Sequence, residues 1–298
     1  MKKVLIFTFA LALLVSCGQS YEEKLRLSKA EKARIAREDA LAFKVGVLPT
    51  LDCLPVYLAQ ERQLFDTLGV SVHVKFRNAQ LDLDTALAGS SIECAVTDRK
   101  RMENMEKHGT ELEALGATNA YWQLISNRTA RLKEPRQLGD KMVAMTRYSA
   151  TDYLTDQILK GVKTSAPVFK IQVNDVNVRL RMLETNSMDA MWLTEPQATS
   201  ARLQKHQVMA DSRQMKEQLG VVAVRSRALV DARRRRQLAL FVKAYNMACD
   251  SLNDKGLINY AAIIRKYCTA DDRTIKSLPK LQYPKLTVPN GTRQQRAL

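Results

Sequence analysis

Polar side chains follow several short apolar runs of this chain, at the point where each run ends. They are Thr50, Asp52 and Cys53 after residues 43–48, Thr97 and Asp98 after 92–96, Arg147, Tyr148 and Ser149 after 141–145, and Trp192 and Glu195 at the end of 188–193. Open α/β sheets bind ligands beyond the carboxyl ends of their strands, where helix N-termini present free N–H groups. If the runs are such strands, these side chains surround a ligand site.

The residue types allow two opposite ligand charges. The Ser149 hydroxyl and the amides of the following helix could hold an oxyanion, and the planar guanidinium of Arg147 suits a carboxylate or sulfonate. Ser149 could equally serve only as a helix N-cap, and Arg147 could be a solvated loop residue. The acids Asp52, Asp98 and Glu195 would suit a cationic or amine-bearing solute instead. The sequence therefore leaves the charge of the ligand open.

Aromatic residues near the same positions favour an organic ligand over a bare inorganic anion. Trp192 ends a buried run and is the best candidate for stacking on a flat solute; the others are Tyr57, Tyr121, Trp122 and Tyr148. The alternative for Trp192 is a tryptophan of the core.

The sequence contains no residue pattern that indicates a metal site or a catalytic site. The three histidines, His73, His108 and His206, are widely separated, and no Cys-x-x-Cys spacing occurs, so we expect no metal site. No Ser/His/Asp set or cysteine-rich iron motif is present, so we expect neither an enzyme nor a cofactor.

The N-terminus carries an export signal. Lys2 and Lys3 precede the apolar run 4–15, and the small Ser16 precedes Cys17. This segment resembles a bacterial lipobox, which implies cleavage before Cys17, a lipid on its thiol and attachment to a bacterial membrane, facing the periplasm. The alternative is an ordinary cleaved signal in which Cys17 is incidental. Both place the protein outside the cytoplasm.

The export signal also bears on the other cysteines and on the charge. Four further cysteines are an even number in an oxidising compartment. Cys249 and Cys268 lie on apolar stripes of successive helices, so they form either a disulfide or two buried thiols, and the pairing of Cys53 with Cys94 stays open. The formal charge of +16 suits an anionic membrane surface or solute. Export excludes nucleic acid as the partner.

Strand and helix patterns alternate along the chain and predict an α/β fold. After the signal (1–17) and a charged tether (18–42), strands are expected at 43–48, 70–76, 92–96, 112–118 and 122–126, with helices between the first three. A second cycle begins at 141–145 and ends with the strand 188–193. A return strand at 221–224 and two helices, 231–252 and 258–267, follow. We expect one lobe from 43–127 plus 222–298, a second from 128–221, and a ligand cleft between them.

The order of short motifs resembles the solute-binding proteins of the nitrate, sulfonate and taurine ABC importers, which also include thiamine-precursor binders. The matches are Leu48-Pro49-Thr50, Pro55 to Ala59, Phe65 with Gly69-Val70, Ala86 to Gly89, Glu93 to Asp98, Gln137 to Lys141, and Asp189 to Pro196. They cover about residues 43–270. Cys53, Glu93 and Asn186-Ser187 depart from the usual pattern, which puts the ligand identity in question more than the fold.

The resemblance implies a two-lobed periplasmic binding protein of type II. Its function would be to bind a small organic anion, sulfonate or thiamine-type pyrimidine and to deliver it, as a monomer, to an ABC permease and its ATPase. Two alternatives stay open: a solute-sensing lipoprotein without a transport role, and an enzyme on the same fold, since the family has catalytic relatives in menaquinone and pyrimidine biosynthesis.

Overall fold

The computed structural model describes residues 21–291, and the side chains from residue 28 on. The chain divides into two compact units, 1–42 and 43–298. The expected signal and the lipidated Cys17 lie outside the described residues.

The described part of the first unit is one helix, α2 (Tyr21–Leu41). Its exposed side chains include Arg34, which pairs with Glu31 at 2.6 Å and with Glu38 at 2.7 Å. Pairs at these spacings stabilise an isolated helix by about 0.2–0.5 kcal/mol each. The segment expected as a tether is therefore helical over most of its length.

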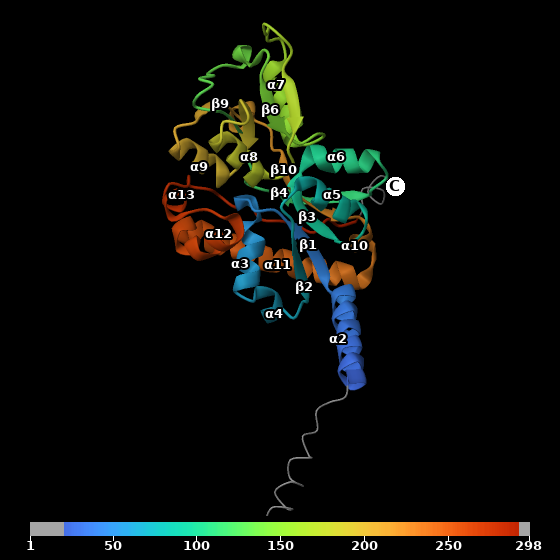
Figure 1. The fold of residues 1–298 in the computed structure, drawn as a ribbon. Helices are drawn as coiled ribbons and strands as arrows, with labels where there is room; N and C mark the ends of the chain where they lie inside the picture. The colour runs from blue at the N-terminus through green and yellow to red at the C-terminus, as the bar shows by residue number, and fades with distance from the viewer. Residues whose placement is uncertain (1–20, 292–298) are drawn as a thin grey trace, which may run out of the picture. The chain divides into compact units, whose positions relative to one another are not determined.

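The second unit holds two five-stranded sheets of equivalent arrangement (Figure 1). The first sheet has the order β2-β1-β3-β10-β4, formed by β1 (Phe43–Val47), β2 (Val72–Phe76), β3 (Cys94–Asp98), β4 (Leu112–Ala117) and β10 (Gly220–Arg225). β1 runs parallel to β2 and β3, whereas β10 is antiparallel to β3 and β4. The parallel strand β3 is buried along its whole length, as a strand covered on both faces requires, whereas β2, at the edge of the sheet, is half-buried and alternates apolar with polar residues.

The second sheet repeats this pattern with the order β7-β6-β8-β5-β9. Its strands are β5 (Gln123–Ser126), β6 (Met142–Met145), β7 (Phe169–Gln172), β8 (Ala190–Leu193) and β9 (Gln207–Asp211). β6 is parallel to β7 and β8, and β5 is antiparallel to β8 and β9. Each sheet thus receives one antiparallel strand directly after the chain crosses from the other sheet.

The crossings lie at residues 118–122 and 212–219, between β4 and β5 and between β9 and β10. The expected boundary at residue 127 places β5 in the first lobe, but β5 hydrogen-bonds only within the second sheet. The return strand in the first sheet is present as β10. The segments α6 (Arg99–Lys107), α9 (Gln197–Leu203) and β9 were not expected from the sequence.

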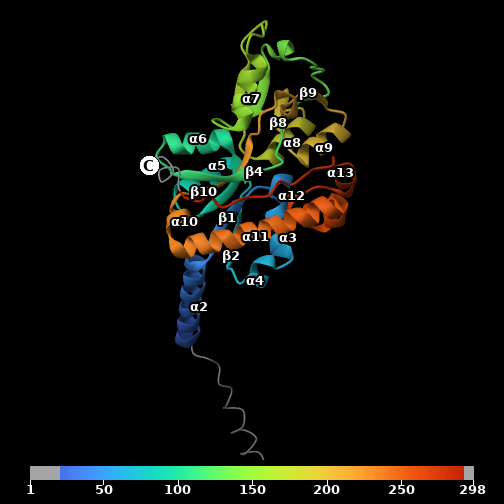
Figure 2. The same ribbon diagram turned by 180° about the vertical axis from the view of Figure 1, so that it is seen from behind.

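Helices cover both sheets. In the first lobe they are α3 (Leu54–Glu61), α4 (Leu64–Thr67), α5 (Gln80–Ala88), α6, α10 (Arg227–Val230), α11 (Ala232–Lys255), α12 (Ala261–Cys268) and α13 (Asp272–Lys276). In the second they are α7 (Ala150–Leu159), α8 (Val176–Glu184) and α9. Figure 2 shows the long α11 beside α3. Its Phe241 packs on Phe43 of β1, with ring centroids 5.7 Å apart.

The tail after α13 is irregular, as expected, but it is fixed to the first lobe. Tyr283 and Leu286 are buried in that lobe's core. The side-chain amides of Asn246 and Asn253 on α11 bind the backbone of the tail at both N–H and C=O groups. The N–H of Thr287 also donates to the Leu115 carbonyl of β4 at 3.0 Å, so the tail is tied to both α11 and the sheet.

All four cysteines from Cys53 on are buried free thiols. Of the two possibilities for Cys249 and Cys268, the structure therefore has the buried thiols and not the disulfide. Cys53 and Cys94 are likewise not joined.

Candidate ligand-binding cleft

Loops at the carboxyl ends of the strands of both sheets meet in a cleft that is nearly closed. Two small cavities remain in it, of about 30 and 20 Å³. Both are lined by Leu48, Thr50 and Gln80 of the first lobe and by Trp122 and Thr194 of the second. We call them the larger and the smaller cleft cavity. The larger has room for about one or two water-sized groups.

Asp98, at the end of β3, joins the two lobes. Its Oδ1 accepts the N–H of Arg101 at 3.0 Å, which caps α6, and the N–H of Ala150 at 2.9 Å, which begins α7 in the second lobe. Burial raises the pKa of Asp98 to about 6, against the opposing effect of the nearby Arg101 charge. The N-terminus of α7 is thus occupied by a carboxylate of the chain itself.

Arg101 lies on the same side of the cleft and is 2% exposed. It forms an ion pair with Asp84 at 2.5 Å, a longer contact of 4.0 Å with Asp98, and a hydrogen bond to the carbonyl of Gln80. A buried guanidinium needs such partners, because an unpaired buried charge is strongly destabilising. The sequence did not mark Arg101, although it stands three residues after Asp98 at a helix start.

A second buried arginine, Arg179 of α8, lines the smaller cleft cavity. Each of its guanidinium nitrogens donates to a neutral oxygen: Nε to the Val173 carbonyl, Nη1 to the Trp192 carbonyl and Nη2 to Thr146 Oγ1. Burial lowers the pKa of Arg179 to about 9. This residue, too, was missed by sequence reasoning, because arginines on helices are usually exposed.

Four buried polar atoms around the larger cleft cavity have no hydrogen-bond partner among the described residues. They are Asp52 Oδ1, Gln80 Oε1, Thr97 Oγ1 and Arg101 Nη1. Burial raises the pKa of Asp52. Buried polar groups are rarely left unpaired, because each costs about 1–3 kcal/mol. Their convergence on one cavity indicates a place for a polar group from outside the chain.

The structure brings together half of the residues that the sequence marked. Thr50, Asp52, Thr97 and Asp98 line the larger cleft cavity, and Trp192 lines the smaller one. Trp192 is fully buried and its Nε1 donates to Thr155 Oγ1 at 2.8 Å, so it is both a core residue and a wall of the cleft.

The other marked residues lie outside both cleft cavities. Arg147 and Tyr148 are exposed on the turn before α7. Ser149 is the N-cap of α7, accepting the N–H of Thr151 at 3.1 Å and donating to the Thr146 carbonyl. Cys53 lies buried beneath the first loop, where its sulfur accepts the N–H of Leu48 at 3.4 Å.

Glu195 also lies outside the cleft cavities. Its carboxylate is held by Tyr121 at 2.5 Å, Arg202 at 2.8 Å and Thr199 at 2.6 Å. Its backbone carbonyl accepts the N–H of Leu51, which ties the loop after β8 to the loop after β1. The side chain is fully used in the second lobe and is not available to a ligand.

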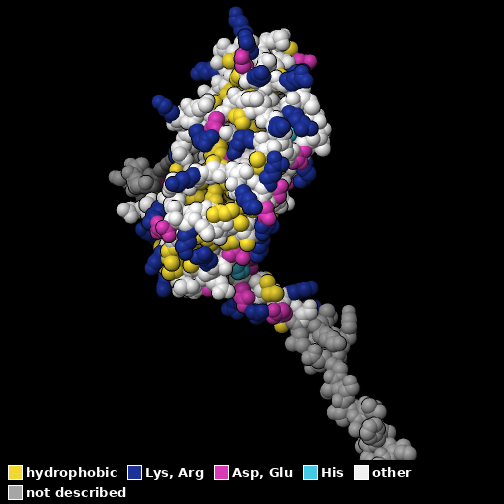
Figure 3. Space-filling view, turned by 90° about the vertical axis from the view of Figure 1, so that its left-hand side faces the viewer, with side chains coloured by type: hydrophobic (Ala, Val, Ile, Leu, Met, Phe, Trp, Pro, Cys, Tyr) yellow, Lys and Arg dark blue, Asp and Glu magenta, His cyan; other side chains and the backbone are white. Residues whose placement is uncertain are grey.

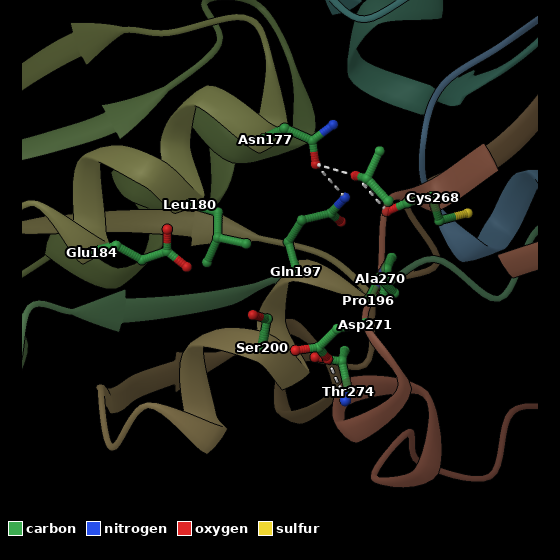
Figure 4. A pocket seen from close by; sticks show the side chains of 11 residues that line it. Asn177, Leu180, Glu184, Pro196, Gln197, Ser200, Cys268, Ala270, Asp271 and Thr274 are labelled. Atoms are coloured by element: carbon green, nitrogen blue, oxygen red, sulfur yellow. Dashed lines mark hydrogen bonds between the residues drawn. The ribbon is translucent and has the colours of Figure 1, made fainter. Parts of the chain in front are cut away.

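A larger cavity of about 170 Å³ lies between α8 and α9 of the second lobe and the segment of α12 and α13 (Figure 4). Gln197, on its wall, donates to Asn177 Oδ1 at 2.8 Å and to the Pro49 carbonyl at 2.9 Å. Thr269 donates to the same Asn177 oxygen at 3.4 Å. This polar bridge is a further link between the lobes.

Residues 21–291 contain no group of three or more His, Cys, Asp and Glu side chains that could hold a metal ion. Within the described part of the chain, no helix combines the length and the apolar character needed to cross a bilayer.

The chain belongs to the NMT1/THI5-like family, whose model matches residues 50–250. No curated protein matches the chain in sequence. Solved structures share the fold, which confirms the resemblance and the two-lobed architecture. The alkanesulfonate-binding protein SsuA from Xanthomonas axonopodis pv. citri, bound to MOPS, is 16% identical with a TM-score of 0.68, over 82% of this chain and 86% of its own.

Two further neighbours extend the comparison. The periplasmic nitrate-binding protein NrtA from Synechocystis PCC 6803 is 15% identical, with a TM-score of 0.65 over 78% of this chain and 68% of its own. The Candida albicans CA3427 gene product, described as having the generic periplasmic binding protein fold, is 14% identical, with a TM-score of 0.61 over 80% and 81%. At these identities the likeness establishes the fold.

Proposed function

We propose that this protein is the extracytoplasmic solute-binding component of an ABC importer and binds a small solute in the cleft between its lobes. The observation that carries the proposal is the cluster of unpartnered buried polar atoms around the larger cleft cavity. The family and the named functions of the structural neighbours support it.

The cleft is suited to binding coupled with closure. Bonds between the lobes surround the cavities: Asp98 to Ala150, Leu51 to Glu195, Gln80 to the carbonyl of Asn174, and Gln197 to Pro49. Ligand sites for small molecules usually measure about 300–1,000 Å³, far more than these cavities. A solute of that size enters only when the lobes separate, and closure then forms the surface that a permease recognises.

The remaining parts of the proposal rest on the sequence. The mature chain would begin at Cys17 and carry a lipid there, act as a monomer, and deliver its solute to a permease and an ATPase. Export and the positive charge fit an anionic membrane surface; Figure 3 shows Lys and Arg side chains spread over the face in view.

The test is a thermal-shift screen of the protein from Gly18 on, against sulfonates, nitrate, carboxylates, pyrimidines, thiamine and amines. A solute at one hundred times its Kd adds about 2.7 kcal/mol, which raises Tm by several degrees. The shift should be lost in Thr97→Val, because Thr97 lines the larger cleft cavity. It should be kept in the control Thr274→Ser, because Thr274 lines the separate cavity shown in Figure 4. Turnover of any solute by the purified protein would contradict a purely binding role.

Lipidation is tested separately. Expression of the whole chain in bacteria with radioactive palmitate should label the wild type and not Cys17→Ala. An unlabelled wild type would favour an ordinary cleaved signal and would leave the binding proposal standing.

A further inference from the structure

We infer that the larger cleft cavity takes a primary ammonium group of the solute, and that this cleft is closed to solutes whose recognised group is an anion. The inference rests on the proposed function and specifies the chemistry of the same site. It follows from three observations: which atoms lack partners, what occupies the start of α7, and how the two buried arginines are paired.

The unpartnered atoms are mainly acceptors. Gln80 Oε1 only accepts, as does Asp52 Oδ1 when its carboxyl group is ionised, and the Thr97 hydroxyl can both accept and donate. Thr97 is only 7% exposed. An ammonium has three N–H donors and no acceptor, so its donors match these oxygens in number and kind.

The charge of the lining favours a cation. The larger cleft cavity is bordered by two carboxyl groups, Asp52 and Asp98, and by one guanidinium, Arg101, which is itself paired with Asp84. Arg101 Nη1 is an open N–H donor beside this cavity and is suited to an oxygen elsewhere on the solute. An ammonium with a neighbouring hydroxyl supplies three donors for the cavity's oxygens and an acceptor oxygen for Arg101.

Anions often bind at the N-terminus of a helix, but in this cleft the N–H groups at the start of α7 already have partners. At the start of α7, the N–H of Ala150 donates to Asp98, that of Thr151 to Ser149 Oγ, and that of Tyr148 to Asp152. An oxyanion approaching these amides would meet the Asp98 carboxylate at close range, and like charges in a buried site repel strongly.

The buried arginines do not compensate for this. Each nitrogen of Arg179 already binds a neutral oxygen, and Arg101 has two carboxylates beside it. Binding an anion at Arg179 would require breaking bonds that satisfy a buried charge, and an anion at the open Nη1 of Arg101 would lie beside the carboxylates of Asp84 and Asp98.

The experiment titrates the protein from Gly18 on, at matched ionic strength and by calorimetry, with three probes that share a two-carbon chain with a hydroxyl at one end. They are 2-aminoethanol hydrochloride, ethylene glycol and sodium isethionate. A ligand of four heavy atoms reaches a Kd of about 0.04 mM at the highest known ligand efficiency, and most bind far more weakly, so titrations extend to about 100 mM. We expect saturable binding of 2-aminoethanol, binding of ethylene glycol at least tenfold weaker, and no binding of isethionate.

Variants locate the effect. Asp52→Asn and the isosteric Thr97→Val should each weaken 2-aminoethanol binding about tenfold or more, and Thr97→Val serves alone if Asp52→Asn does not fold. Asp271 is an acid on the wall of the cavity in Figure 4, and Asp271→Asn should leave the affinity for 2-aminoethanol unchanged. Asp98→Ala frees the Ala150 amide and should gain binding of isethionate.

Several results would overturn the inference. If isethionate binds the wild type as tightly as 2-aminoethanol does, the proposed solute-binding role is supported, while the inference about the ammonium group is refuted. Equal binding of ethylene glycol, no binding of 2-aminoethanol at 100 mM, or loss of binding in Asp271→Asn would also refute it. In those cases the broader solute screen decides the proposed function independently, since an anion or a pyrimidine would still register there.

Discussion

At the scale of single residues, the cleft is organised by Asp98. One oxygen of this side chain accepts two backbone N–H groups, one from each lobe, and the carboxylate is 2% exposed. Its position after a strand and before a helix was readable from the sequence, because short acids in that place cap helices. Its contact across the cleft was not, since no pattern within one segment reports a partner 52 residues away.

Asp98 makes stability depend on pH. Its pKa of about 6 lies above the unfolded value near 3.8, so protonation favours the folded state. The contribution of protonated Asp98 to the free energy of unfolding is fully present below pH 4. It is lost as the pH rises through 6, and the loss is at most about 3 kcal/mol. In urea titrations, the unfolding free energy of the wild type minus that of Asp98→Asn should therefore fall between pH 4 and 7. A flat difference would contradict the burial of a charged Asp98.

Trp192 should contribute to stability as well as to the cleft wall. Trp192→Phe removes the hydrogen bond from Nε1 to Thr155 and leaves a cavity beside β8, at a cost of about 1–3 kcal/mol. Urea unfolding at pH 7 measures this cost. Tyr148→Phe is the matched control, because that aromatic is 63% exposed and should change stability by less than about 0.5 kcal/mol.

Arg101, Gln80 and Arg179 show where reading by residue fails. All three lie on helices that follow strands. Nothing in their local sequence shows that their side chains line the cleft, and arginine and glutamine on helices are usually exposed. Only the packing of α5, α6 and α8 against the cleft makes them part of the site.

At the scale of elements, strands were more predictable than short helices. The run of β3 and the alternation of β2 produce clear patterns, whereas α6 presents only Met102 and Met105 as buried apolar residues among charged ones. α9 has seven residues, too few for a helical period to show. The strand β5 was recognised but assigned to the wrong lobe, because strand patterns do not encode which sheet a strand joins.

The packing of α5 on β1 depends on Gly46. A Cβ at this position would lie 2.3 Å from Leu83 Cδ1 and 2.6 Å from Ile92 Cδ1, both in the core. Gly46→Ala should therefore destabilise the protein by about 1–3 kcal/mol through overpacking. Thermal unfolding compared with the wild type checks it. If Gly46→Ala;Leu83→Ala is no more stable than expected from adding the single effects, the clash is not with Leu83.

At the scale of the whole molecule, the fold was predictable because short motifs along the chain, taken in their order, pointed to the family whose model matches residues 50–250. Neighbours at 14–16% identity share the architecture with TM-scores of 0.61–0.68. The ligand was not predictable in the same way, because a few side chains in the cleft change its chemistry while the sheets stay the same.

The second unit is held together without covalent cross-links. Cys53, Cys94, Cys249 and Cys268 are buried, and burial raises the pKa of each thiol. The protein from Gly18 on should react with iodoacetamide at none of them when folded and at all four in guanidinium chloride, as measured by mass spectrometry. Its Tm should be the same with and without reductant. A mass two units lower, with two reactive thiols, would instead indicate a Cys249–Cys268 disulfide.

Two crossings join the sheets, at residues 118–122 and 212–219, and they would limit how the lobes part if the protein opens as the proposed function requires. A body tied to another at one point can turn about any axis, but two ties leave one easy rotation, about the line that joins them. Opening along that line separates the same side chains in the same order each time. Under the proposed function, the path by which a solute leaves the cleft would therefore depend on the connectivity of the chain as much as on the side chains that line it.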